Sequence, residues 1–194
     1  MTEDRGQKTG NETSVIRHPS SVIRHPSSVI RHLVFWPVFI AGLALDLWTK
    51  KAVFEWLRNA EIDAFTIIDG FLRLQLAVNP GAAFGMAAGH RWKLIAVSVA
   101  ALAVVLLVFL FAAGSRKIFN VALGLFAAGV CGNLYDRLFN GGFVRDFIDV
   151  VYWPGRHWPA FNVADSMLCI AVALLILSSF TARQSCQTRA QQQK

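Results

Sequence analysis

Two acidic residues, Asp146 and Asp165, have no basic residue at a spacing that would neutralise them on a helix. Two carboxylates about 4 Å apart repel each other by roughly 4 kcal/mol at an effective dielectric constant of about 20. That energy separates their titrations by around three pKa units, so near neutral pH one carboxyl is ionised while the other holds a proton. Such a pair can take a proton from water and donate one to a carbonyl oxygen. If the chain folds Asp146 against Asp165, the sequence predicts a site that hydrolyses an amide bond.

A competing interpretation of Asp165 is structural. The residue lies in the opening turn of an apolar run, three positions after Asn162. A negative charge there interacts favourably with the N-terminal end of a helix. This interpretation leaves Asp146, in the segment "VRDFID", unexplained.

Other polar residues are grouped near the ends of apolar runs. Asp46 and Lys50 stand four residues apart, which favours an ion pair that finishes a helix at the membrane surface, with a supporting role in a site as the alternative. The segment "GNLYDR" places three polar side chains on one helix face, and a network joining helix ends is the favoured role because buried charges are normally paired. These side chains are Asn133, Asp136 and Arg137.

The segment "NPGAAFGM", residues 79–86, is rich in small residues around Asn79 and Gly81. Glycine adopts backbone conformations that other residues resist and lets a backbone approach closely. Two interpretations stay open: a turn that enters the membrane, or a wall along which Asn79 binds an extended peptide.

Composition indicates which elements must position these residues. The chain has 194 residues, of which 55% are hydrophobic and only 16% are charged, whereas a soluble domain carries about 25% charged residues. Four apolar runs, 33–45, 92–113, 118–134 and 161–180, approach or exceed the roughly 20 residues that cross a bilayer, the first if its helix continues to Thr49. We therefore expect an all-α membrane protein with four transmembrane helices. Between the first two helices, residues 65–78 are rich in β-formers and predict a small extracytoplasmic β-structure.

The net charge of +7 could indicate a nucleic-acid partner, but its distribution favours membrane orientation instead. If the N-terminus is cytoplasmic, ten of the basic residues and only three of the acidic ones lie on the cytoplasmic side. Basic residues in short cytoplasmic loops set orientation. Both termini are therefore expected in the cytoplasm, and no nucleic acid is expected as a partner.

Metal and cofactor sites are not expected. There is no H-E-x-x-H motif, and the three cysteines are scattered without metal-ligand spacing. Three histidines recur in a repeated unit, "SVIRHPS", within residues 1–32, but no carboxylate or cysteine accompanies them there. That segment predicts a disordered tail because proline interrupts it. Residues 33–183 are expected to form the membrane domain, and residues 184–194 a polar cytoplasmic tail.

Five segments in this order and spacing resemble lipoprotein signal peptidase (signal peptidase II). They are "DLWTK", "NPGAAFGM", "GNLYDR", "VRDFID" and "FNVADS". The resemblance covers about residues 33–183. It implies a monomeric aspartyl endopeptidase of the bacterial inner membrane, without a cofactor, that acts near the outer leaflet. Its substrates would be prolipoproteins, cut before a cysteine that already carries diacylglycerol, with membrane lipids as its surroundings.

The resemblance also implies roles for particular residues. Asp146 and Asp165 would be the catalytic pair. Supporting or substrate-binding residues would be Asn79, Gly81, Asn133, Asp136, Arg137 and Asn162, and Asp46 and Lys50 would be structural. The main alternative is a small ion or proton transporter that uses carboxylates in the membrane as a relay. It predicts polar residues at mid-membrane depth, where the run 92–113 offers only Ser98.

Overall fold

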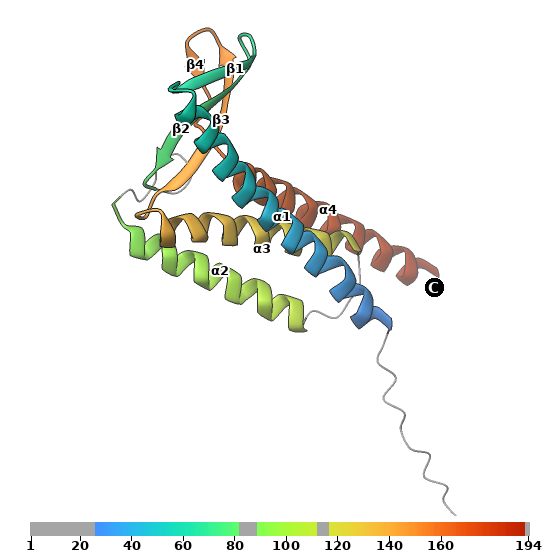
Figure 1. Cartoon of the computed structure of the whole chain (residues 1–194). Helices are drawn as coiled ribbons and strands as arrows, with labels where there is room; N and C mark the ends of the chain where they lie inside the picture. The colour runs from blue at the N-terminus through green and yellow to red at the C-terminus, as the bar shows by residue number, and fades with distance from the viewer. Residues whose placement is uncertain (1–25, 82–88, 112–116, 193–194) are drawn as a thin grey trace, which may run out of the picture.

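Four helices form the body of the molecule (Figure 1). The computed structural model describes the backbone of residues 26–81, 89–111 and 117–192, and the side chains of residues 30–81, 89–111 and 117–180. Each helix in these ranges contains a segment long and apolar enough to cross a membrane, which confirms the predicted four-helix membrane fold. The helices are α1 (Pro26–Asn59), α2 (Arg91–Phe111), α3 (Lys117–Phe139) and α4 (Val163–Gln192). The repeated units before Pro26 and most of the α2–α3 connection lie outside the described residues.

Two helices are longer than the apolar runs suggest. Helix α1 begins at Pro26 rather than near residue 33, because proline is well suited to the first turn of a helix. It also continues past Thr49 to Asn59, where Phe54 and Leu57 are 3% and 0% exposed and the helix contacts the sheet. Helix α4 extends to Gln192 and so includes most of the segment expected as a polar tail.

Helix α3 is the central helix. In its most apolar window 56% of residues are buried, against 11–17% in the other three helices, which present most of their surface to lipid. Small residues allow the close approach: a Cβ atom added at Gly129 would lie 2.6 Å from the carbonyl oxygen of Ala164 on α4. Membrane helices commonly pack through such small residues. The first turn of α4 is thereby held tightly against α3.

A four-stranded antiparallel sheet in the order β1-β2-β3-β4 lies at one end of the bundle, and the start of α1 and the end of α4 lie at the other (Figure 1). Strands β1 (Ala64–Ile68) and β2 (Leu72–Asn79) confirm the β-structure predicted between the first two helices. Strands β3 (Val144–Trp153) and β4 (Arg156–His157) come from the α3–α4 connection. The sequence does not predict strands in that connection, because the three charged residues of β3 mask its apolar alternation.

Strand β3 links the sheet to the start of α4. In its register with β2, Ala77 is opposite Asp146 and Asn79 is opposite Val144. An isolated bridge joins Ile148 to Phe161, with the Ile148 amide donating to the Phe161 carbonyl at 2.8 Å. The sheet therefore positions both β3, which contains Asp146, and the segment at Phe161, which leads into α4 and Asp165.

Candidate active site

Asp165 is held by the N-terminal turn of α4. The Asp165 backbone amide donates to Asn162 Oδ1 at 2.9 Å, and the Asn162 backbone amide donates to Asp165 Oδ2 at 3.2 Å. This is a reciprocal capping box, in which each side chain satisfies the other residue's amide. Helix capping, the structural interpretation of Asp165, is therefore correct, but it uses only one carboxylate oxygen. The other oxygen, Oδ1, accepts a hydrogen bond from Asn133 Nδ2 at 2.7 Å.

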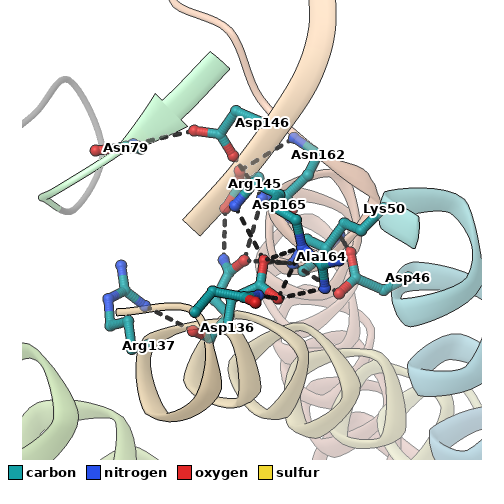
Figure 2. Close-up of polar contacts among 12 residues, drawn as sticks. Asp46, Lys50, Asn79, Asp136, Arg137, Arg145, Asp146, Asn162, Ala164 and Asp165 are labelled. Carbon is teal, nitrogen blue, oxygen red and sulfur yellow. Dashed lines mark hydrogen bonds and ion pairs between the residues drawn. The ribbon is translucent and has the colours of Figure 1, made fainter. Parts of the chain in front are cut away.

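Asp146 is held by two asparagines. Asn162 Nδ2 donates to Asp146 Oδ1 at 2.6 Å, and Asn79 Nδ2 donates to Oδ2 at 3.1 Å. Asn162 thus contacts both acidic residues. Its backbone amide and side-chain oxygen form the capping box with Asp165, and its side-chain NH₂ group donates to Asp146. Figure 2 shows Asp146 reaching from the strand and Asp165 from the helix toward this shared asparagine.

Asn133 connects the pair to a buried cation. Its Oδ1 accepts hydrogen bonds from Lys50 Nζ at 3.0 Å and from Asn162 Nδ2 at 3.1 Å, while its amide nitrogen donates to Asp165. These contacts fix which end of the Asn133 side chain faces Asp165. A hydrogen-bond donor therefore points at the carboxylate, and the acceptor points at the ammonium group.

Lys50 and Asp46 form the predicted i, i+4 ion pair, and it is buried within the protein. Their side chains are 0% exposed, with Nζ and Oδ2 2.8 Å apart. Asp46 Oδ1 accepts the backbone amide of Ala164 at 2.8 Å, and Lys50 also lies 3.6 Å from Asp136. The ion pair does not finish the helix, as the simpler interpretation expected, because α1 continues to Asn59, and its further partners come from α3 and α4. The pair ties α1 to the first turn of α4.

Asp136 and Arg137 support the sheet side of the site. Asp136 Oδ1 lies 2.7 Å from Arg145 Nη2, and its Oδ2 accepts the Arg145 backbone amide at 2.9 Å. Arg137 donates to the backbone carbonyl of Gly81 at 2.9 Å, and the Gly81 amide donates to Asn79 Oδ1 at 2.9 Å. Arg137 therefore holds the chain that follows β2, and with it the asparagine that contacts Asp146.

A large cavity opens on both acidic residues. It measures about 1240 Å³ and is bounded at its polar end by Asp146, Asp165, Asn79 and Arg137. Most of the rest of its wall is apolar, although Asn133, Ser98 and Ser166 also line it, and it includes Leu94, Val97, Phe126, Leu168 and Trp158. An extended chain with a hydrophobic attachment fits this combination of a polar end and an apolar channel.

Burial sets the titration of Asp146, which is 2% exposed. Its pKa is raised from the ordinary 3.8 to about 6, mainly by loss of hydration, and the negative charge of Asp165 contributes to the same rise. Hydrogen bonds from Asn79 and Asn162 oppose the shift by stabilising the carboxylate. The site thus brings together one buried carboxyl group with a raised pKa and a second carboxyl group that shares Asn162 with it.

The structure brings together all ten sequence-predicted residues through the contacts described above. Sequence reasoning missed Arg145 as the partner of Asp136, and it missed the buried Asp149, which lies 2.8 Å from His157 and 3.5 Å from Arg73. In β3, Arg145, Phe147 and Asp149 lie on the face opposite Asp146, so these partners follow only once the segment is known to be a strand. Among the described residues, no group of three or more histidine, cysteine or acidic side chains could hold a metal ion.

Comparison with known proteins identifies the family of this chain. The profile of the family described as Signal peptidase (SPase) II matches residues 38–181. The chain is 39% identical to the lipoprotein signal peptidase of Rhodopirellula baltica over 166 residues, covering 76% of this chain and 71% of the relative. It is also 39% identical to that of Geobacter sulfurreducens over 145 residues, covering 73% and 88%.

Solved structures give the same result. A bacterial membrane enzyme determined by the in meso method at 2.3 Å resolution superposes with a TM-score of 0.67 at 29% identity, covering 76% of this chain and 88% of that one. A second, at 1.9 Å resolution, gives a TM-score of 0.61 at 30% identity, covering 73% and 88%. With its four apolar helices, the protein is a multi-pass bacterial membrane protein. The chain belongs to the signal peptidase II family, the lipoprotein signal peptidases.

Proposed function

We propose that this peptidase is of the aspartic type and that Asp146 and Asp165 are its catalytic pair. It removes the signal peptide from diacylglyceryl-modified prolipoproteins by cutting before the lipidated cysteine. The observation that carries the proposal is the pair of hydrogen-bonded carboxyl groups at the polar end of an otherwise apolar cavity.

In this mechanism the pair holds one proton. The raised pKa of Asp146 favours that carboxyl as the site of the proton, and Asp165 is then the base. Asp165 takes a proton from a water molecule while the oxygen of that water attacks the scissile carbonyl carbon. Asp146 gives its proton to the carbonyl oxygen. A tetrahedral gem-diol forms.

Collapse of the gem-diol returns both carboxyls to their starting state. A proton passes from Asp165 to the leaving amide nitrogen, the C–N bond breaks, and one hydroxyl proton of the gem-diol passes back to Asp146. Asn133 and Asn162 keep the carboxylates oriented throughout, because each donates to one of them. Asn79 and Arg137 line the cavity beside the pair and are the proposed contacts for the extended peptide backbone.

The apolar wall is the proposed site of the diacylglycerol chains. Each buried CH₂ group contributes about 0.8 kcal/mol, so two acyl chains offer more binding free energy than the side chains near one scissile bond. Part of that free energy can hold the bond against the carboxyl pair, and its loss lowers turnover as well as affinity.

The orientation belongs to the same proposal: both termini are cytoplasmic, and the sheet and the carboxyl pair face the outer leaflet of the inner membrane. It is supported by the excess of basic residues near the chain ends. The same proposal has the enzyme act as a monomer, which is supported by the fact that one chain supplies both carboxyls and their hydrogen-bond partners.

A paired-substrate assay tests the proposal. The purified protein is incubated in mixed micelles with a diacylglyceryl prolipoprotein and, separately, with an unlipidated precursor of the same sequence. We expect cleavage of the first, with a new N-terminus at the lipidated cysteine by mass spectrometry, and very slow cleavage of the second even at saturation. Equal turnover of both precursors, or cleavage at another bond, would contradict the assignment.

A further inference from the structure

A second cavity, of about 230 Å³, lies between the C-terminal part of α1 and the start of β3. It shares only Val78 with the wall of the active-site cavity. Three basic side chains, those of Lys51, Arg58 and Arg145, line it together with one acidic side chain, that of Glu55. The balance of charge in its wall is positive, so the cavity favours an anion.

The basic residues are placed at the depth of lipid headgroups. Lys51, Glu55 and Arg58 have i, i+4, i+7 spacing and therefore share one face of α1. A rise of about 1.5 Å per residue spreads this face over roughly 10 Å along the helix. It begins immediately after the apolar part of α1, where the hydrocarbon layer ends and the headgroup layer, several ångströms thick, begins.

Two of the cations are available to a ligand. Within the described residues, no carboxylate lies within ion-pair distance of Arg58, whose guanidinium group lies over the Phe54 ring at 5.7 Å. Lys51 is 3.8 Å from Glu55, but the two side chains are 70% and 61% exposed, and such an ion pair in water contributes little. Arg145 is different, because it is already bound to Asp136 at 2.7 Å.

The remaining wall is apolar except for Asn140. Phe54, Phe143 and Val78 form its apolar part beside the basic residues. A free inorganic anion makes no use of such a wall, whereas a phospholipid presents its glycerol and first acyl carbons next to its phosphate. Basic pockets beside transmembrane helices are a recognised form of lipid headgroup site.

We propose that this cavity binds the headgroup of an anionic phospholipid, with the phosphate held by Arg58 and Lys51 and the glycerol against Phe54 and Phe143. A zwitterionic lipid fits less well, because its cationic headgroup adds positive charge beside two basic residues. The bound lipid also touches Arg145, the residue before Asp146, so the site lies one residue from the carboxyl pair. The proposal does not depend on the peptidase mechanism.

Native mass spectrometry of the full-length protein tests it. The protein is released from micelles containing equal amounts of phosphatidylglycerol and phosphatidylcholine with identical acyl chains, and the retained lipid is identified. We expect the wild type to retain phosphatidylglycerol in preference. The double variant Lys51→Gln/Arg58→Gln should lower that preference about thirtyfold, the change expected for two basic residues near an anionic surface.

Two further variants separate the cavity from bulk charge. Lys93→Gln/Arg156→Gln removes the same charge from exposed positions at the sheet end of the molecule, outside this cavity, and should keep the preference. Glu55→Gln removes the acidic group from the cavity wall and should strengthen retention. If both double variants lose the preference equally, or if neither does, the cavity is not the site.

A competition arm distinguishes the lipid from free phosphate. Millimolar inorganic phosphate should leave phosphatidylglycerol bound, because it lacks the apolar contacts. Displacement of the lipid by phosphate would overturn the lipid assignment. Thermal unfolding of each variant is compared with that of the wild type, so that loss of the lipid preference can be separated from loss of the fold. If the Lys51→Gln/Arg58→Gln variant unfolds at a lower temperature, the single substitution Arg58→Gln replaces it.

Discussion

Each carboxyl group of the candidate pair accepts a hydrogen bond from an asparagine whose other polar atoms also form hydrogen bonds. Asn133 is oriented by Lys50, and Asn162 is oriented by the first turn of α4. A side-chain amide offers both a donor and an acceptor, so it can face a cation on one side and a carboxylate on the other. Asparagine therefore suits these positions better than a third acid or a serine.

Replacing either acid tests the pair directly. Asp146→Asn and Asp165→Asn should each lower prolipoprotein cleavage by at least about a thousandfold, because an amide neither accepts nor delivers the proton. Asp69→Asn makes the same chemical change at an exposed turn position and should retain wild-type activity. The measurement is initial rate in mixed micelles, and substantial activity in either site variant would remove that residue from the mechanism.

The raised pKa of Asp146 also predicts how stability depends on pH. Between about pH 4 and about pH 6 the folded protein retains a proton on Asp146 that the unfolded chain has lost. The free energy of unfolding therefore falls as the pH rises through that interval, and above the interval it stays at the lower value. Asp146→Asn cannot ionise, so near neutral pH it should be more stable than the wild type by up to about 3 kcal/mol.

Thermal unfolding in detergent from about pH 4 to neutral pH measures this difference. The wild type and the variant should have similar midpoints at the acidic end and diverge as the pH increases. Asp69→Asn again serves as the control and should follow the wild type. Parallel curves for all three proteins would show that Asp146 titrates normally.

Much of the site could be predicted from residue type and spacing, but not its internal geometry. The sequence indicates Asp146 and Asp165 because neither has a basic residue at helical spacing. Their connection through Asn162 could not be predicted, because it depends on the Ile148–Phe161 bridge between a strand and a helix start. The partner of Asp136 was missed for the same reason: Arg145 reaches it only when β3 is a strand.

At the scale of elements, α3 and the sheet together determine where the acids lie. Apolar length was sufficient to predict four helices, because the bilayer sets a minimum span. It did not predict where α1 ends, since Phe54 and Leu57 are buried by packing close to the sheet rather than by lipid. It also did not predict β3, whose apolar and charged residues share both faces.

Close packing of α3 and α4 makes Gly129 sensitive to substitution. A Cβ atom there would lie 2.6 Å from the Ala164 carbonyl oxygen and 2.7 Å from Leu168 Cγ, so one helix must move. We expect Gly129→Val to destabilise the protein by about 1–3 kcal/mol, the usual cost of overpacking. Activity should fall as well, because Asp165 follows Ala164 directly.

The matched control for this substitution is Ala103→Val, at an exposed position of α2. It adds apolar volume to a surface that faces lipid, and should change neither the thermal midpoint nor the cleavage rate. Both variants are compared by thermal unfolding and by the prolipoprotein assay. Normal activity and stability in Gly129→Val would mean that the helices can separate without moving the acid.

For the whole molecule, the described fold begins at Pro26, and every candidate site residue lies well beyond it. We expect a chain that lacks residues 2–25 to retain wild-type cleavage and membrane insertion, because a polar repeat interrupted by proline contributes no apolar core. Arg31 is retained so that a basic residue still precedes the first membrane span. Loss of insertion or of activity in this deletion would assign a role to the removed residues.

The order of the strands has a consequence for how the protein is made. Strand β2 pairs with β3, which follows it only after the whole α2–α3 hairpin has been synthesised, and Asn162 and Asp165 come later still. The first three spans of a nascent chain are therefore made before Asp146, Asn162 and Asp165. Under the proposed mechanism, proteolytic capacity arises only when the last helix inserts, so an unfinished or truncated chain has no means of cutting the signal peptides around it.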